Sequence, residues 1–378
     1  MFTPDKKFTF FLICLGNIAI SFNIAALTAS VPVISQDLGL QDFQVARIIS
    51  YYLIPYGVAA LIYAPLTKVI SYRRILSISF LIFGISSLVC ALAQSLSTIL
   101  LFRIGMGIGG AGIIPLGLLI IGEFFDKKVR GRLVGTFFSG SFFASVAGII
   151  LSGVAHWRWQ FIIPFLISAV IVLGCYSSKA NILKKIHGVS VNYLSVFQKP
   201  QLRNVCLFIF AISFLYHAVH KWFGVYLARE YMMDKFTISF FFILMSIGGF
   251  CGQMLGGIIS DKSGRKAACV IGVAGLALAT MALWGHYSFL ILGLILTSLT
   301  LFWTIGHNGI STVLTDFADL DRPMIASLNS SVRFISGGLG FYISGFFVRQ
   351  NFSLTFFVIG LLILILVFII NNIIDKHI

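Results

Sequence analysis

Twelve long apolar runs follow one another along this sequence, and they restrict its fold more than any other feature. Each run is long enough to cross about 30 Å of hydrocarbon as a helix. Inside a bilayer every backbone polar group needs a partner within the protein, so helices and closed barrels are the structures that can span it. The runs predict membrane-spanning helices near residues 8–33, 45–70, 75–94, 98–121, 132–154, 159–177, 204–227, 237–260, 267–285, 288–312, 324–347 and 353–373.

The composition supports the same class of protein. Hydrophobic residues make up 58% of the chain and charged residues 10%, which is far from the balance of a soluble domain. A net charge of +15 would suit nucleic acid if the basic residues covered one solvated face, but they lie in short clusters between apolar runs. We therefore expect an integral membrane protein that contacts the lipid bilayer and binds no nucleic acid. The cysteines have no paired or ligand-like spacing, so no metal and no cofactor are expected.

The basic residues also indicate how the chain is oriented. If the N-terminus is cytoplasmic, most of the 27 Lys and Arg residues lie in inside segments. The outside segments then hold Arg158, Arg229, Lys235 and Arg349. By the positive-inside rule, we expect a multi-pass protein of the bacterial plasma (inner) membrane with both termini cytoplasmic. We also expect a monomer.

A short charged turn occurs twice and indicates an internal repeat. Residues 256–266 read GGIISDKSGRK between two apolar runs, and a weaker copy, APLTKVISYRR, occupies residues 64–74. A separation of about half the chain predicts a protein built from two repeated halves. The predicted domains are an N-terminal six-helix bundle at 1–177, a cytoplasmic linker at 178–203 and a C-terminal six-helix bundle at 204–378.

Three short motifs lie within the predicted helices or next to their ends. Residues 257–266, GIISDKSGRK, fit the loop pattern G-x-x-x-D-[RK]-x-G-[RK]-[RK]. Residues 103–111, RIGMGIGGA, fit R-x-x-x-G-x-G-[AG]-[AG], and residues 157–161, WRWQF, fit W-R-W-x-F. With these motifs the chain resembles the major facilitator superfamily, and within it the twelve-helix drug:proton antiporter branch. The resemblance implies an all-α integral membrane protein with twelve transmembrane helices in two six-helix pseudo-repeat bundles.

Two positions depart from the pattern of that branch. Lys68 stands where the first copy of the loop motif has an aspartate, and residues 144–148 read ASVAG where the fifth helix of the antiporters has G-P-x-x-G-G. The second departure weakens the inference of an antiporter. In the intact copy, an aspartate at a helix end can meet the positive N-terminus of a neighbouring helix. The resemblance therefore implies an inner gate at Gly257, Asp261, Gly264, Arg265 and Lys266, which could instead serve membrane topology alone.

Ionisable residues within membrane spans are costly, so they are candidates for function. The acidic residues all fall in loops, tails or helix ends, whereas several basic residues fall within spans. The resemblance implies that the first, fourth, seventh and tenth helices line a central cavity, and most of these basic residues lie on them. We predict substrate contacts at Arg103, Lys221, His217, His220, Arg333, Asn17 and Asn23.

The spacing of three of these residues suggests what they bind. His217, His220 and Lys221 can share one helical face. Clustered cations repel one another unless an anion joins them, and an arginine fork suits a carboxylate or phosphate. We hypothesise an anionic substrate held between Arg103 on one half and Lys221 with His217 or His220 on the other. Because imidazole titrates near neutral pH, His217 or His220 is the expected carrier of any coupled proton.

Each of these residues also has a structural interpretation. Arg103 could hydrogen-bond backbone carbonyls at a helix kink, and Lys221 could extend its ammonium to the outer interface. Arg333 could pair with Asn329, four residues earlier.

The leading function from the sequence is a secondary transporter of a small organic anion by alternating access, with export favoured. Its substrate would be a carboxylate, a phosphate-bearing metabolite or a polycarboxylate siderophore. One alternative is proton-coupled efflux of neutral or cationic drugs, and uniport or anion exchange also stays open. From another class, an intramembrane lipid-modifying enzyme is disfavoured because no nucleophile or carboxylate accompanies the histidines. A non-transporting receptor on the same fold is a further alternative.

Overall fold

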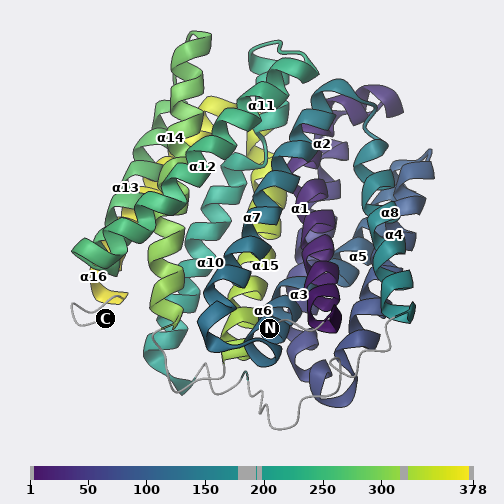
Figure 1. Cartoon of the computed structure of the whole chain (residues 1–378). Helices are drawn as coiled ribbons and strands as arrows, with labels where there is room; N and C mark the ends of the chain where they lie inside the picture. Colours follow the sequence, from purple (N-terminus) through teal and green to yellow (C-terminus); the bar gives the residue numbers. More distant parts are fainter. Residues whose placement is uncertain (1–3, 178–192, 194–197, 316–321, 374–378) are drawn as a thin grey trace. The chain divides into compact units, whose positions relative to one another are not determined.

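A computed structural model describes residues 4–177, 193, 198–315 and 322–373, and the regular structure in these ranges is helical (Figure 1). The predicted linker at 178–203 falls mostly outside the described residues. The helices are α1 (Pro4–Leu38), α2 (Asp42–Val45), α3 (Arg47–Val69), α4 (Tyr72–Leu92), α5 (Leu96–Gly110), α6 (Ile113–Phe124), α7 (Lys127–Val154), α8 (Trp159–Ser177), α10 (Pro200–His220), α11 (Phe223–Glu230), α12 (Lys235–Ser263), α13 (Arg265–Ala282), α14 (Phe289–Thr315), α15 (Arg322–Val348) and α16 (Phe352–Ile373).

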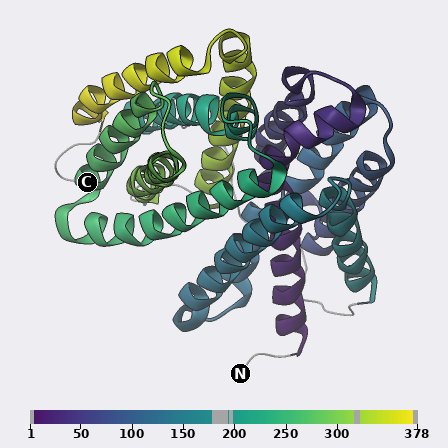
Figure 2. The ribbon, with the colours of Figure 1, turned by 90° about the horizontal axis from the view of Figure 1, so that it is seen from above.

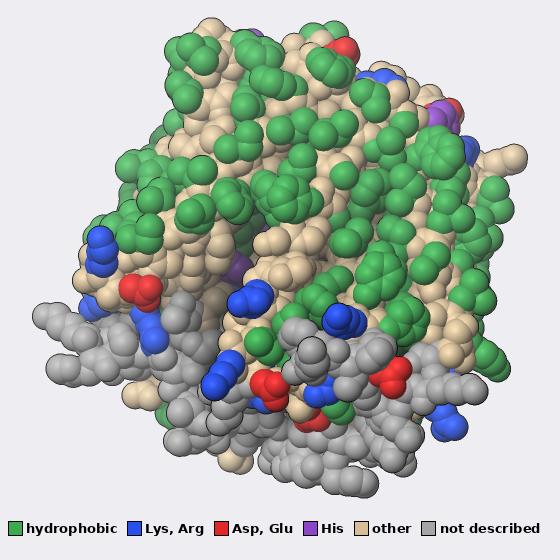
Figure 3. Space-filling model, in the orientation of Figure 1, with side chains coloured by type: hydrophobic (Ala, Val, Ile, Leu, Met, Phe, Trp, Pro, Cys, Tyr) green, Lys and Arg blue, Asp and Glu red, His purple; other side chains and the backbone are tan. Residues whose placement is uncertain are grey.

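Twelve helical segments within these ranges are long and apolar enough to cross a membrane. This confirms the predicted number, and the ends differ from the prediction by a few residues. In Figure 3 hydrophobic side chains cover the length of the helices, while charged side chains gather near helix ends. Three spans consist of two consecutive helices, namely α2 with α3, α5 with α6 and α10 with α11.

The helices group into two compact units. Unit 1 comprises residues 1–191 and 321–335, and unit 2 comprises residues 192–320 and 336–378. In unit 1, α5 packs on α3 and α4, and α4 packs on α8; in unit 2, α14 packs on α12 and α13, and α13 packs on α16 (Figure 2). The second, third, fourth and sixth spans of each half are therefore paired in the same way, as a pseudo-repeat requires. The domain boundaries given above stay a prediction.

Glycines bring the helices around α14 into backbone contact. On α12, Gly248, Gly252 and Gly256 recur every four residues and face α14, so that a Cβ at Gly256 would lie 3.0 Å from the Ile305 Cα. On the α13 side, a Cβ at Gly309 would lie 2.9 Å from the Cys269 sulfur. Small residues in such rows let membrane helices approach closely enough for van der Waals attraction to hold them. The glycines thus fix α14 between α12 and α13.

The ends of α12 follow from local chemistry. Asp234 caps the first turn, since its carboxylate accepts the Thr237 backbone N–H at 2.9 Å. Hydrogen bonds from the Thr237 side chain and backbone lower the pKa of Asp234. At the other end Gly264 has a φ of 86°, a conformation that glycine adopts without steric cost. This glycine of the loop motif lets the chain leave α12 and begin α13 at the next residue.

Candidate functional site

Arg103 is buried in unit 1 and is held by neutral groups. Its Nε donates to the Ile48 carbonyl at 3.0 Å, and its Nη1 donates to the Asn23 Oδ1 at 2.6 Å. The guanidinium carbon lies 4.3 Å from the centroid of the Tyr52 ring, and Nη1 lies 3.7 Å from the Met106 sulfur. Attraction between the cation and the ring face adds to these bonds. Arg103 therefore joins α5 to α1 and α3, as the structural interpretation expects.

The same network extends to α7 and α8 through two asparagines of α1. The Asn23 Nδ2 donates to the Gln160 backbone carbonyl at 2.8 Å, and the Gln160 Nε2 donates to the Gly148 carbonyl at 3.1 Å. The Asn17 Nδ2 donates to the Phe137 carbonyl at 2.9 Å. Gln160 is fully buried, but sequence reasoning missed it because its position within the WRWQF motif does not show which way it faces. Both asparagines thus bond within unit 1, and substrate contact by them stays a prediction.

The glycines that follow Arg103 in its motif have a packing role. A Cβ at Gly107 would lie 3.1 Å from the Tyr56 backbone nitrogen of α3, and one at Gly109 would lie 2.6 Å from the Ser79 carbonyl oxygen of α4. The motif therefore combines one buried cation with the surface on which α3 and α4 pack. The span is interrupted at Ala111 and Gly112, between α5 and α6.

Unit 2 has its basic cluster at a helix break. The seventh span is interrupted at Lys221 and Trp222, between α10 and α11. Lys221 is buried, with 8% of its surface exposed. Trp222 is also buried, and its Nε1 donates to the Ser344 hydroxyl of α15 at 2.9 Å. The break therefore lies at a buried lysine, and the tryptophan next to it is bonded to α15.

His217 and His220 lie on the same side of α10 but differ in their contacts. The His217 Nδ1 lies 2.8 Å from the Ser213 carbonyl oxygen, one turn earlier. The His220 Nδ1 is buried without a hydrogen-bond partner among the described residues. Both rings contact Tyr216, His217 edge to face at 5.1 Å and His220 stacked at 4.9 Å between centroids. The two histidine rings thus share one face of α10 with Tyr216, and the place of Lys221 on that face stays a prediction.

An aromatic stack joins this face to α14. The ring of Trp303 lies parallel to that of Tyr216, with centroids 3.8 Å apart, and His307 stacks on Trp303 at 5.7 Å. His217 meets Trp303 edge to face at 5.9 Å. Sequence analysis did not single out Trp303, because one tryptophan in an apolar helix gives no sign of the partner it faces. The resulting set of rings from α10 and α14 is called the imidazole–aromatic cluster below; its members are Tyr216, His217, His220, Trp303 and His307.

Arg333 is bonded as its structural interpretation predicts. Its Nε donates to the Asn329 Oδ1 at 2.7 Å within α15, and the side chain is 9% exposed. Substrate contact by Arg333 stays a prediction.

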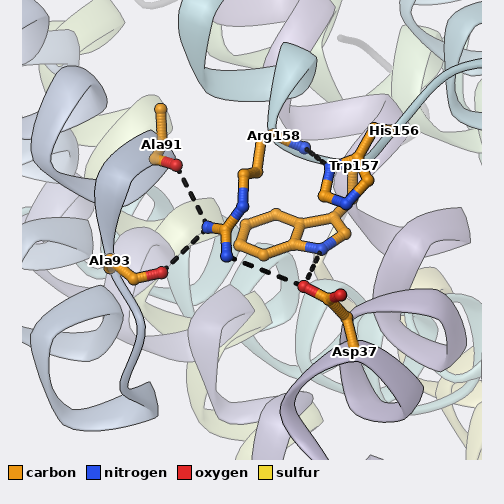
Figure 4. A network of polar contacts seen from close by, with 6 residues as sticks. All are labelled: Asp37, Ala91, Ala93, His156, Trp157 and Arg158. Carbon is orange, nitrogen blue, oxygen red and sulfur yellow. Dashed lines mark hydrogen bonds and ion pairs between the residues drawn. The ribbon is translucent and has the colours of Figure 1, made fainter.

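The W-R-W motif closes one end of unit 1 through a polar network (Figure 4). The Trp157 Nε1 donates to the Asp37 Oδ2 at 2.9 Å, and Arg158 approaches the same carboxylate at 3.7 Å. The Arg158 Nη1 donates to the carbonyls of Ala91 and Ala93 at 3.1 and 2.8 Å, and its guanidinium covers the Trp157 ring at 4.3 Å. The motif therefore ties the ends of α1 and α4 to the start of α8.

The loop motif lies at an exposed turn. Gly257 packs against α14, since the Asn308 Nδ2 would lie 3.6 Å from a Cβ placed there. Asp261 is exposed and makes no hydrogen bond or ion pair with residues in the described ranges. Arg265 and Lys266 begin α13 and are half-buried. A gating role for this motif stays a prediction.

Comparison with known proteins identifies the family. The sequence profile of the Major Facilitator Superfamily matches residues 13–220 and 204–371. The chain therefore belongs to the Major Facilitator Superfamily, and it is a multi-pass secondary transporter with twelve candidate spans. Since this is a family of transporters, the chain is not an enzyme.

Relatives within the family differ in what their names say they carry. An Escherichia coli (strain K12) protein described as "Probable L-galactonate transporter" is 23% identical over 88% of this chain and 80% of its own length. "Multidrug resistance protein 3" of Bacillus subtilis (strain 168) is 27% identical, over 44% of this chain and 33% of its own length. These relatives place the chain among transporters without fixing its substrate.

Solved structures support the fold. A bacterial homologue of the human lysosomal transporter Spinster, inward-facing and unoccupied, matches with a TM-score of 0.75 and 16% identity over 99% of this chain and 98% of its own. A human organic anion transporter matches with a TM-score of 0.71 and 14% identity over 98% of this chain and 100% of its own. At these identities the likeness confirms the predicted fold alone.

Proposed function

We propose that this chain transports a small organic anion bearing a carboxylate or phosphate by alternating access. In this proposal Lys221 and His217 contact the anion in unit 2. Arg103 is assigned primarily to holding α1, α3 and α5 together. The substrate could be a hydroxylated acid such as the one in the name of the galactonate relative, or a polycarboxylate of the siderophore type.

One observation carries the proposal, namely how acidic and basic residues are distributed along the helices. Lys221 lies at a break in the middle of a span, and Arg103 and Arg333 lie within helices. A cationic interior favours an anionic ligand, because the ligand offsets charge that is costly to bury. The acidic residues in the described ranges all lie within two residues of a helix end or at its cap: Asp5, Asp37, Asp42, Glu123, Asp126, Glu230, Asp234 and Asp261.

The first test is thermal unfolding of the purified full chain with a panel of ligands. The panel contains galactonate, citrate, a hexose phosphate, a neutral drug and a lipophilic cation. A ligand at about 100 times its dissociation constant adds roughly 2.7 kcal/mol to the free energy of unfolding, which is a measurable rise in Tm. We expect anions to stabilise the wild type and Lys221→Met to lose this stabilisation.

Lys235→Met is the matched control, because Lys235 is an exposed lysine at the start of α12. It should respond to anions as the wild type does. If the same anion stabilises Lys221→Met as much as the wild type, Lys221 does not contact the anion. Stabilisation by the lipophilic cation alone would overturn the anion proposal.

That last outcome would support the alternative function, proton-coupled efflux of neutral or cationic drugs in the antiporter branch. The W-R-W motif and the similarity to the Bacillus subtilis multidrug protein favour it. Uptake of the stabilising ligand into vesicles that contain the protein separates transport from the receptor alternative.

We also propose that the protein lies in the bacterial plasma (inner) membrane with both termini cytoplasmic. The excess of basic residues in the segments assigned to the inside supports this orientation. A fluorescent protein that matures only in the cytoplasm, fused after Ile378, should fluoresce. The same protein inserted between Met232 and Met233, at the turn after α11, should stay dark. The reverse pattern would invert the topology.

A further inference from the structure

We propose that proton uptake at His217 and anion binding beside Lys221 strengthen each other, so that proton and anion cross the membrane in the same direction. The inference rests on the proposed function and adds its coupling. It assigns different roles to the two histidines of α10, which the sequence treats alike.

His217 can accept a second proton without losing its structural bond. The Ser213 carbonyl oxygen, 2.8 Å from the His217 Nδ1, can only accept a hydrogen bond. The Nδ1 atom therefore carries a hydrogen in the neutral ring, and the titrating atom is Nε2. The bond to Ser213 persists in both states, which keeps the ring oriented while its charge changes.

Aromatic rings and a helix backbone pack against His217 and fix its position. Tyr216 and Trp303 meet it nearly perpendicularly, with interplanar angles of 84° and 82°. The backbone of α15 covers another side, because a Cβ at Gly337 would lie 2.9 Å from the His217 Cγ. The imidazole–aromatic cluster thus holds His217 in one place.

His220 lacks these properties. Its Nδ1 is buried without a hydrogen-bond partner in the residues that the structure describes. Its ring stacks on Tyr216 and lies 5.6 Å from the Phe223 ring and 6.3 Å from the Phe242 ring. A second proton would bury another N–H among apolar rings with no acceptor, which is costly. We assign His220 to packing in its neutral form.

Among the residues that the structure describes, the titratable groups near His217 are neutral or basic. From α10 they are Tyr216, His220 and Lys221, and α14 contributes His307, which stacks on Trp303. On α15, Arg333 precedes Gly337 by four residues. A proton on His217 adds to this positive charge, and an anion offsets it. Binding of the anion must therefore be accompanied by proton uptake, and the effect is reciprocal.

The sign of this coupling determines the direction of transport. When proton and anion favour each other, an inward proton gradient drives the anion inward. Export by exchange requires the opposite, namely that each ligand excludes the other. The structure of the cluster thus favours uptake over the export that the sequence motifs favour.

The test measures the affinity of the full chain for galactonate from pH 5.5 to 8, because the carboxylate of galactonate stays ionised throughout this range. For the wild type we expect the dissociation constant to fall about ten-fold from pH 8 to pH 6. His217→Asn should bind with little dependence on pH, since the asparagine amide can keep the bond to the Ser213 carbonyl without titrating. His220→Phe is the matched control: it keeps a stacked ring on Tyr216 and should retain the pH dependence.

Proton uptake is measured directly by calorimetry in two buffers of different ionisation enthalpy. Galactonate should bring net proton uptake in the wild type and in His220→Phe, and none in His217→Asn. Proton release on binding, or uptake that persists in His217→Asn, would overturn the inference while leaving anion binding intact. Absence of galactonate, citrate and hexose phosphate binding at every pH would overturn the proposed function, and this coupling with it.

Discussion

Replacement of Gly252 by alanine will lower the free energy of unfolding by about 3 kcal/mol, a large effect for a single methyl group. A Cβ at this position would press on the Leu301 carbonyl oxygen and on the Thr304 Oγ1 of α14. The carbonyl belongs to the helix backbone, so it cannot turn aside. The α12 and α14 helices must separate instead, and the attraction between them falls steeply with distance. Thermal unfolding in detergent measures the change.

Gly249→Ala is the matched control on the same helix. Its Cβ would have an ordinary contact, 3.7 Å from the Thr304 methyl group. Because alanine favours a helix over glycine by about 1 kcal/mol, this variant should be neutral or slightly more stable. Equal losses in both variants would show that glycine is needed for flexibility along α12 rather than for contact with α14.

Replacement of Arg103 by leucine is expected to lower the free energy of unfolding by about 2 kcal/mol and to abolish transport. The change leaves the Asn23 Oδ1 and the Ile48 carbonyl without their donor in a buried place. Each such loss costs about 1 kcal/mol or more, although bonds between membrane helices average less than this. The single ammonium of a lysine cannot reproduce the two-armed hydrogen bonding of the Arg103 guanidinium. Arg103→Lys should therefore recover little of the lost stability or transport.

A double-mutant cycle with Asn23→Leu checks the cause. If Arg103 acts through Asn23, the two losses of stability will not add, and the pair will differ from the sum by about 1 kcal/mol. If the losses of stability in Arg103→Leu and Asn23→Leu add up in the double variant, the two residues act independently. Full stability of Arg103→Leu with loss of galactonate binding would return Arg103 to the substrate-contact role that the sequence suggests.

The sequence predicts the spans well because a bilayer imposes a length and an apolar composition on each of them. The helix predicted at 75–94 lies at Tyr72–Leu92, and the one predicted at 159–177 agrees at both ends. The breaks at Ala111 and Lys221 were not predicted, because neither position carries a proline and the apolar run continues on both sides of it. At the second break, Trp222 bonds to Ser344 of α15, a contact that the sequence does not reveal.

The candidate site was predicted in part. Composition identifies Arg103, Lys221 and His217, because a charge inside an apolar run is visible without a structure. Gln160 gives no comparable signal, because it is a polar residue with ordinary neighbours in the sequence. The same holds for Trp303, which is one aromatic residue in a chain rich in them. Their roles depend on which helix they face, and one sequence does not contain that information.

The glycine contacts on both sides of α14 also determine how strain can spread through unit 2. Where side chains separate two helices, rotamer changes can absorb a small displacement. Where two helix backbones are in direct contact, no side chain can adjust in this way. We therefore expect α12, α13 and α14 to move as one rigid group. Trp303 belongs to α14, the central helix of this group, and stacks on Tyr216 of α10. We therefore expect a displacement of the rings near His217 to move α12, α13 and α14 together.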